Sequence, residues 1–178
     1  MNILFSHYAI IYKEGFGRSF MLAKNLARLG NSVTFLTCQP SNQFKFPYYT
    51  VKEENVLIIA FPDFVPNFFR RTGFGILSTV LKCFYILSKN YDIVHSDNGH
   101  RPSSGIPCVL HSLFRKSKHI MEWWDYFGRG GQYDEKRFIK KITHGVYDLI
   151  TEVPSKKLVD GVVSLSEFTK KRAIANSI

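Results

Sequence analysis

Residues 2–37 follow the pattern of a β-loop-α-β unit, and this pattern restricts the fold more than any other part of the chain. The apolar residues 2–6 predict a strand, the amphipathic residues 20–29 a helix, and residues 33–37 a second strand. Gly15 and Gly17 stand in the loop before the helix. Glycines at this point let a ligand or a neighbouring loop approach the backbone at a helix N-terminus.

The rest of the chain alternates strands with helices. Further strands are predicted at residues 48–52, 55–61, 91–95, 119–123 and 161–165, and further helices at residues 73–89, 102–115, 134–150 and after Ser166. Such alternation predicts an α/β fold, a Rossmann-like, doubly wound, mostly parallel sheet with helices on both faces. We expect residues 1–178 to form a single domain.

Composition indicates a folded protein. Of the 178 residues, 45% are hydrophobic and 21% are charged, which is ordinary for a globular chain and excludes disorder. The 16 phenylalanines favour a Phe-rich core. Three cysteines without paired spacing indicate a reducing compartment. With no basic, apolar leader ahead of the first strand, we expect a cytoplasmic protein.

The net charge of +10 restricts the partners rather than the fold. Lysines and arginines are scattered, and no nucleic-acid-binding signature is present, so nucleic acid is not expected as a partner. An anionic membrane surface and phosphorylated small molecules stay on as candidate partners. Residues 64–71 combine three Phe with two Arg, which suits a membrane interface, but core packing of these rings is favoured.

In doubly wound sheets, ligands bind beyond the carboxyl ends of the strands. This rule selects the loops that follow Ser6, His95, Trp123 and Leu165. A dinucleotide fingerprint is disfavoured because Phe20 takes the place of its third glycine and the second strand lacks a following acid. The loop with Gly15, Gly17 and Arg18 is equally compatible with a plain connection and with contacts to phosphate or sugar.

Polar groups follow the strand at residues 91–95. His95, Asp97 and His100 place two imidazoles and a carboxylate after a buried strand, where an acid, base or hydrogen-bond donor can act. For each residue alone, a structural role is the stronger interpretation. No carboxylate or cysteine completes a recognisable ligand spacing, so no metal site is predicted.

Glu122, Trp124 and Asp125 end the strand at residues 119–123. Because side chains alternate along a strand, Glu122 and Trp124 share one side of the sheet and Trp123 takes the other. A carboxylate beside flat rings is suited to sugar recognition, and a packed aromatic corner is an equally good interpretation.

These segments resemble the N-terminal domain of a GT-B glycosyltransferase of the retaining family 4. The resemblance rests on residues 1–5, 15–17, 26–37, 92–96, 120–127 and 160–167. It implies transfer of a sugar, of the hexosyltransferase type, from a nucleoside-diphosphate sugar to an acceptor hydroxyl, with retention and without a metal or cofactor.

The resemblance also implies roles for particular residues. Catalytic roles, including orientation of the acceptor, fall to Glu122, Asp125 and His100, and substrate binding falls to Gly15, Gly17, Arg18, His95, Asp97, Trp124, Ser166 and Glu167. Many family members carry His or Arg where this chain has Trp124, so no residue is assigned as the equivalent of that histidine.

The resemblance further implies a C-terminal donor-binding domain that this chain lacks, so the fragment alone is expected to be inactive. The expected partners are that domain, a nucleotide-sugar and a glycan or lipid-linked acceptor. The expected setting is surface polysaccharide or glycolipid synthesis, in the cytoplasm or peripherally on the inner face of the cytoplasmic membrane. Two alternatives stay open, a non-catalytic module that docks on a membrane or subunit and a GT-B type nucleotide-sugar epimerase.

Overall fold

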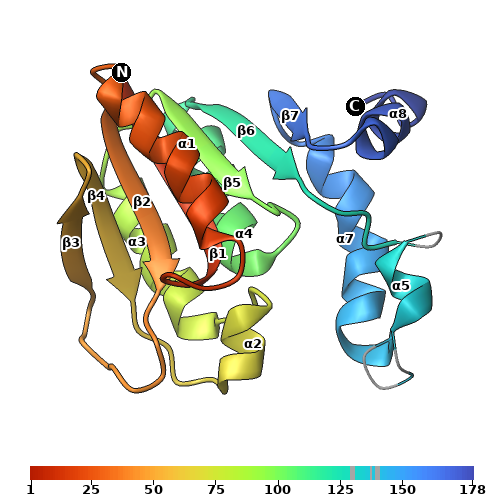
Figure 1. Ribbon diagram of the computed structural model, residues 1–178, viewed down its shortest axis with the longest axis horizontal. Coiled ribbons are helices and arrows are strands. Elements are labelled where there is room, and N and C mark those ends of the chain that lie inside the picture. The colour runs from red at the N-terminus through yellow and green to blue at the C-terminus, as the bar shows by residue number, and fades with distance from the viewer. Residues whose placement is uncertain (129–130, 137, 139–140) are drawn as a thin grey trace.

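The fold is a single twisted sheet of seven strands with helices on both faces. The structure is a computed structural model that describes residues 1–128, 131–136, 138 and 141–178, without the side chain of residue 143. The strand order is β3-β4-β2-β1-β5-β6-β7, and every neighbouring pair is parallel except β3 and β4. Helix α1 lies in front of the sheet in Figure 1, and α3 and α4 lie behind it. The predicted α/β fold is confirmed.

The elements have the following bounds. The strands are β1 (Asn2–Ile10), β2 (Ser32–Cys38), β3 (Tyr49–Glu53), β4 (Val56–Phe61), β5 (Ile93–Asp97), β6 (Lys118–Trp123) and β7 (Gly161–Ser164). The helices are α1 (Phe16–Arg28), α2 (Asn67–Arg71), α3 (Ile76–Leu87), α4 (Pro102–Arg115), α5 (Gln132–Glu135), the π-helix η1 (Lys141–Gly145), α7 (Val146–Lys156) and α8 (Glu167–Ala175).

The chain changes direction across the sheet between β1 and β5. From β1 it proceeds outward through β2 to the β3–β4 edge, then returns through α3 to β5 on the other side of β1. The carboxyl ends of β1 and β5 therefore meet at a topological switch point, where open α/β sheets bind ligands.

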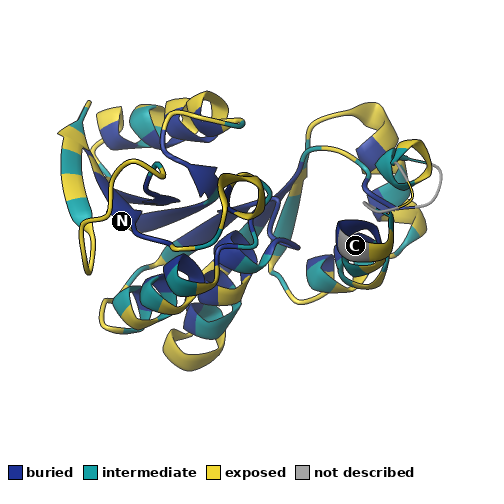
Figure 2. Ribbon diagram, turned by 90° about the horizontal axis from the view of Figure 1, so that it is seen from below, coloured by how far each residue is buried: buried dark blue, intermediate teal, exposed yellow. Residues whose placement is uncertain are grey.

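The two faces of the sheet carry two separate cores. Alternation along β1 directs Phe5 toward α1, where it packs with Phe16, Phe20 and Phe35. The other face packs Leu4 and aliphatic residues of the central strands against α3 and α4. Figure 2 shows these strands buried (dark blue) between helices whose outer surfaces are exposed (yellow). The Phe-rich core is confirmed on the α1 face.

The prediction of one helix over residues 134–150 is wrong. Helix α5 ends at Glu135, the π-helix η1 follows at residues 141–145, and α7 begins at Val146. Lys136 has an extended backbone (ψ 140°), and its Nζ lies 2.5 Å from Asp148 Oδ2. The described residues of this stretch therefore form separate helical segments instead of one helix. Residues 137 and 139–140 lie outside the described part of the chain.

Core packing of the rings in residues 64–71 is also a wrong prediction. The side chains of Phe64, Phe68 and Phe69 are 69%, 44% and 41% exposed. Arg70 is buried instead, because its guanidinium donates to the carbonyl oxygens of Val65 and Gln39. The loop is therefore held by an arginine and exposes its phenylalanines.

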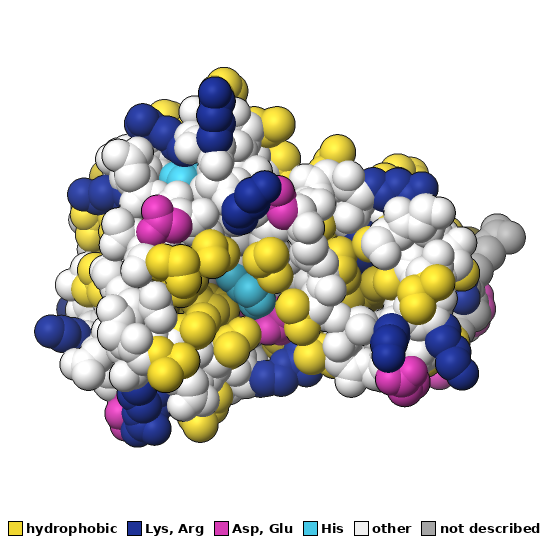
Figure 3. Space-filling view, turned by 90° about the horizontal axis from the view of Figure 1, so that it is seen from above, with side chains coloured by type: hydrophobic (Ala, Val, Ile, Leu, Met, Phe, Trp, Pro, Cys, Tyr) yellow, Lys and Arg dark blue, Asp and Glu magenta, His cyan; other side chains and the backbone are white. Residues whose placement is uncertain are grey.

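The surface mixes cationic and apolar groups. On the face shown in Figure 3, Lys and Arg side chains stand singly or in small groups around hydrophobic side chains gathered near the middle. None of the helices in the described part of the chain combines the length and the apolar character needed to cross a membrane.

Candidate functional site

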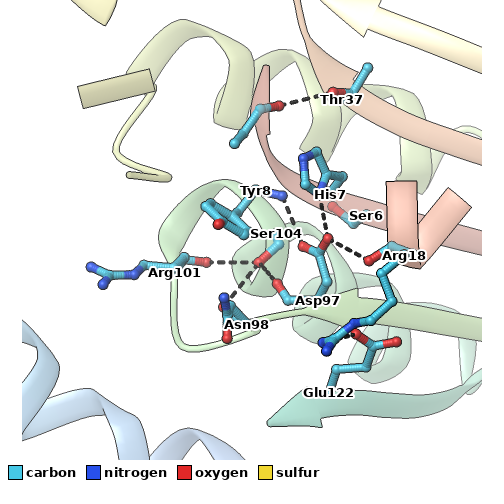
Figure 4. Close-up of polar contacts among 12 residues, drawn as sticks. Ser6, His7, Tyr8, Arg18, Thr37, Asp97, Asn98, Arg101, Ser104 and Glu122 are labelled. Atoms are coloured by element: carbon cyan, nitrogen blue, oxygen red, sulfur yellow. Dashed lines mark hydrogen bonds and ion pairs between the residues drawn. The ribbon is translucent and has the colours of Figure 1, made fainter. Parts of the chain in front are cut away.

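Asp97, the last residue of β5, lies at the switch point with both carboxylate oxygens occupied. Oδ1 accepts the backbone N–H of Tyr8 at 2.9 Å, and Oδ2 accepts Ser19 Oγ at 2.9 Å and the Nδ1 hydrogen of His7. Figure 4 shows these contacts converging on Asp97 from β1 and α1. Its side chain is 1% exposed. Asp97 therefore joins β5, β1 and α1, and its contact with substrate stays a prediction.

Glu122, which pairs with Asp97 across β5 and β6, is the centre of a second group. Its Oε2 accepts Arg18 Nη2 at 3.3 Å and the indole N–H of Trp124, while Oε1 lies 3.5 Å from His95 Nε2. The Arg18 guanidinium lies 4.0 Å from the centre of the Trp124 ring. Four of the predicted site residues thus come together, and Glu122 and Trp124 share one side of the sheet as predicted.

Gly15 completes this group because the Trp124 ring lies directly against it. A Cβ atom at Gly15 would come within 2.0 Å of the ring, and the residue has φ +72°. Gly17 has open space where its Cβ would be. The first glycine is therefore required by the close approach of Trp124, and the second is free of that constraint.

A third group surrounds Asp148 of α7. Its Oδ1 lies 2.9 Å from Arg101 Nη1 and 3.5 Å from His100 Nε2, and its Oδ2 lies 2.5 Å from Lys136 Nζ. Burial alone raises the pKa of Asp148, but the hydrogen bond from His100 and the charge of Arg101 hold it below its ordinary value. The His100 ring, 1% exposed, also contacts Phe127.

A cavity of about 570 Å³ opens beside these groups. Its lining residues are Tyr8, Phe68, Arg71, Thr72, Asn98, Arg101, Phe127, Gln132, Glu135, Lys136 and His144. Asn98 is 3% exposed with φ 44°, and its Oδ1 accepts no hydrogen bond from the described residues. The cavity thus combines aromatic rings with charged groups, as small-molecule binding sites do.

Three predicted site residues lie outside these groups. Asp125 is exposed in the loop after β6. Ser166 is the N-cap of α8, where its Oγ accepts the N–H of Thr169 at 3.1 Å, and Glu167 lies 3.4 Å from Lys170 Nζ. The described residues contain no group of three or more His, Cys, Asp or Glu side chains placed to hold a metal ion.

Several residues of the site are absent from the sequence-based prediction. His7, Tyr8 and Ser19 hold Asp97, and Asp148 joins Arg101 to Lys136. The one signal in the sequence is the polar pair His7-Tyr8 just beyond the predicted strand. Strand β1 continues through this pair to Ile10 with an irregular register after Ser6.

Two buried histidines predict that the fold loses stability in mild acid. Burial lowers the pKa of His100 to about 3 and that of His119 to about 4, from an ordinary value of 6.5. Below pH 6.5 the unfolded state therefore binds more protons than the folded state. The free energy of unfolding is therefore unaffected by these histidines above pH 6.5. It decreases by about 1.4 kcal/mol per pH unit for each histidine as the pH falls from there toward the folded-state pKa values.

Urea denaturation at a series of pH values measures this effect. His119→Gln should reduce the slope of the free energy of unfolding against pH. Unchanged stability of the original chain across this pH range would contradict the prediction.

A comparison with solved structures agrees with this fold. No protein-family model and no curated protein sequence matches the chain. Among solved structures, sucrose-phosphate synthase from Thermosynechococcus elongatus is similar, with a TM-score of 0.63 and 11% identity. The match covers 98% of this chain and 44% of that enzyme's chain. The chain thus spans less than half the length of that enzyme, and its fold resembles part of a GT-B enzyme.

Proposed function

We propose that this chain is the acceptor-side domain of a retaining GT-B glycosyltransferase similar to family 4. The observation that carries the proposal is the convergence of Gly15, Arg18, Glu122 and Trp124 at the switch point of a sheet that resembles part of such an enzyme. The reaction transfers a sugar from a nucleoside-diphosphate sugar to an acceptor hydroxyl.

The N-terminus of α1 is suited to the diphosphate of the donor. Gly15 is its N-cap without a side-chain hydrogen bond, and the first turn carries no acidic residue. The Arg18 side chain is 46% exposed there. The N–H groups of Gly15 and Gly17, together with Arg18, stabilise the negative charge that develops on the leaving group, usually a large contribution to catalysis.

The cavity of about 570 Å³ is suited to the acceptor. Rings of Tyr8 and Phe127 offer flat apolar surface to the acceptor. Glu122 and the exposed Asp125 orient the acceptor. His100 is buried, so we assign it a positioning role through Asp148 and Arg101.

The remaining parts of the proposal follow from the family resemblance. A donor-binding domain completes the active site, which fits a match to only 44% of a GT-B chain. His95, Asp97 and Trp124 shape the binding site, and Ser166 and Glu167 contribute to substrate binding from the β7–α8 junction. We assign the reaction to surface polysaccharide or glycolipid synthesis on the cytoplasmic side of the membrane, with a glycan or lipid-linked acceptor and no cofactor.

Glu122→Gln tests the site. The substitution removes the charge that Arg18 faces, and we expect transfer by the native protein to fall by about 100-fold, as for loss of a single electrostatic contact at a reacting centre. Glu54→Gln is the control, because Glu54 also pairs with cations, Lys24 and Arg28, but in the turn between β3 and β4. Both are compared by initial rates of labelled sugar transfer. Equal rates for Glu122→Gln and the unchanged protein would remove Glu122 from the site.

A further inference from the structure

Helix α3 packs Ile86 and Leu81 against the core, but it also buries polar residues and exposes apolar ones. Its buried residues include Ser78, Thr79 and Lys82, and Lys82 Nζ donates to the carbonyl oxygens of His7 and Ser103. Its exposed large apolar residues are Ile76 (62% exposed), Val80 (45%) and Phe84 (71%). These three recur every four residues and so form one stripe. The helix therefore exposes apolar side chains while it buries its one charged residue.

Helix α4 repeats this pattern beside α3. It buries small and polar residues, among them Ser104, Gly105 and His111, and exposes Ile106 (45%), Leu113 (71%) and Phe114 (71%). The two helices end side by side, because the guanidinium of Arg115 donates to the carbonyl oxygen of Leu87. We call the surface formed by Ile76, Val80, Phe84, Ile106, Leu113 and Phe114 the α3–α4 face. Soluble monomers rarely expose so many large apolar side chains together.

A shallow apolar hollow extends the α3–α4 face. It has a volume of about 250 Å³, and Phe84, Leu81 and Tyr85 of α3 line it together with Pro47, Tyr48, Phe61 and Ser88. Phe44 and Phe46, just before this stretch, are 59% and 67% exposed. The apolar surface therefore continues from α3 toward the edge of the sheet.

The two helices of the α3–α4 face carry cations and no acids. Residues 64–91 and 98–121, which contain both helices, include no Asp or Glu. Exposed cations at the C-terminal ends of the two helices are Lys89, Arg115, Lys116 and Lys118. Lys118 pairs with Asp160. Apolar side chains bordered by cations match the interface of a membrane that contains anionic lipids.

We propose that the α3–α4 face docks the protein on an anionic membrane surface. A second copy of the chain is a poorer occupant, because a two-fold interface centred on this face brings the same cations of both copies together. The proposal concerns the face of the sheet that α3 and α4 cover and is independent of sugar transfer.

Vesicle sedimentation of the native protein tests the proposal. The vesicles are phosphatidylcholine alone, or phosphatidylcholine with an equal part of phosphatidylglycerol. The apolar variant is Phe84→Gln/Leu113→Gln, which changes side chains that are already 71% exposed. Its control is Leu29→Gln/Phe168→Gln, one Leu just after α1 and one Phe on α8 that are 78% and 52% exposed. The charge variant Arg115→Gln/Lys116→Gln is compared with the exposed pair Lys52→Gln/Lys157→Gln.

We expect binding to the anionic vesicles, weakened by salt, and a decrease of about tenfold in the partition coefficient for the apolar and charge variants. The two controls should bind like the unchanged protein. Failure to sediment with anionic vesicles, or an equal decrease in the controls, would overturn the proposal. Self-association in solution that the apolar variant abolishes would also overturn it, because the α3–α4 face would then be a protein interface.

Discussion

Replacement of Asp97 by alanine should lower the free energy of unfolding by about 3–5 kcal/mol, the usual cost of removing one partner from a buried charged network. The side chain of Asp97 is 1% exposed and accepts hydrogen bonds from His7, the Tyr8 backbone and Ser19. Alanine leaves these donors buried without an acceptor, and each such group costs about 1–3 kcal/mol. Urea denaturation followed by circular dichroism measures the change.

Asp92→Ala is the matched control. Asp92 also joins two strands, since it accepts the backbone N–H of Asn2 at 2.7 Å, but it is exposed. Water replaces that contact, so we expect a loss of about 1 kcal/mol or less. If Asp97→Ala fails to fold, Asp97→Asn still allows the comparison, because it retains the shape and removes the charge. Equal losses for the Asp97 and Asp92 variants would contradict the anchoring role.

Replacement of Gly15 by alanine should reduce sugar transfer by about 100-fold, the effect of displacing a catalytic group by about 1 Å. A Cβ at this position comes within 2.0 Å of the Trp124 ring, so the ring must move. That ring also donates to Glu122 and lies beneath Arg18, so both charged groups move with it. Initial rates of labelled sugar transfer measure the effect.

Gly30→Ala separates this steric effect from backbone strain. Gly30 has φ +87°, similar to the +72° of Gly15, but no atom lies within 4 Å of its added Cβ. Both variants therefore introduce an alanine at positive φ, which costs about 1–2 kcal/mol of stability. Only Gly15→Ala should reduce transfer. A similar loss of transfer in both variants would attribute the effect to stability alone.

The order of strands and helices could be predicted from local patterns, because apolar alternation and caps depend on neighbouring residues. Helix α4 has the predicted bounds, and Ser166 caps α8 as predicted. The continuation of β1 through His7 and Tyr8 could not be predicted from local patterns. His7 contacts the carboxylate of Asp97, which lies 90 residues further along the chain.

In the candidate site, too, contacts that follow from local sequence could be predicted, and contacts between distant residues could not. Glu122 and Trp124 were placed together by strand alternation, which is a local rule. The group of Arg101, Lys136 and Asp148 joins residues up to 47 positions apart. In the sequence, Lys82 interrupts a stretch of mostly apolar residues. Its burial could not be predicted, because it depends on the packing of α3 against β1 and α4.

Sugar transfer by the native protein, isolated with an antibody to this chain, tests the central claim most directly. The protein is incubated with labelled nucleoside-diphosphate sugars and with lipid and glycan extracts of its source cells. We predict a labelled product that forms only when an acceptor is present and retains the anomeric configuration of the donor. Release of an epimer or free sugar without any acceptor would indicate an epimerase, and failure to transfer from every donor would indicate a docking module; either result would contradict the proposed function.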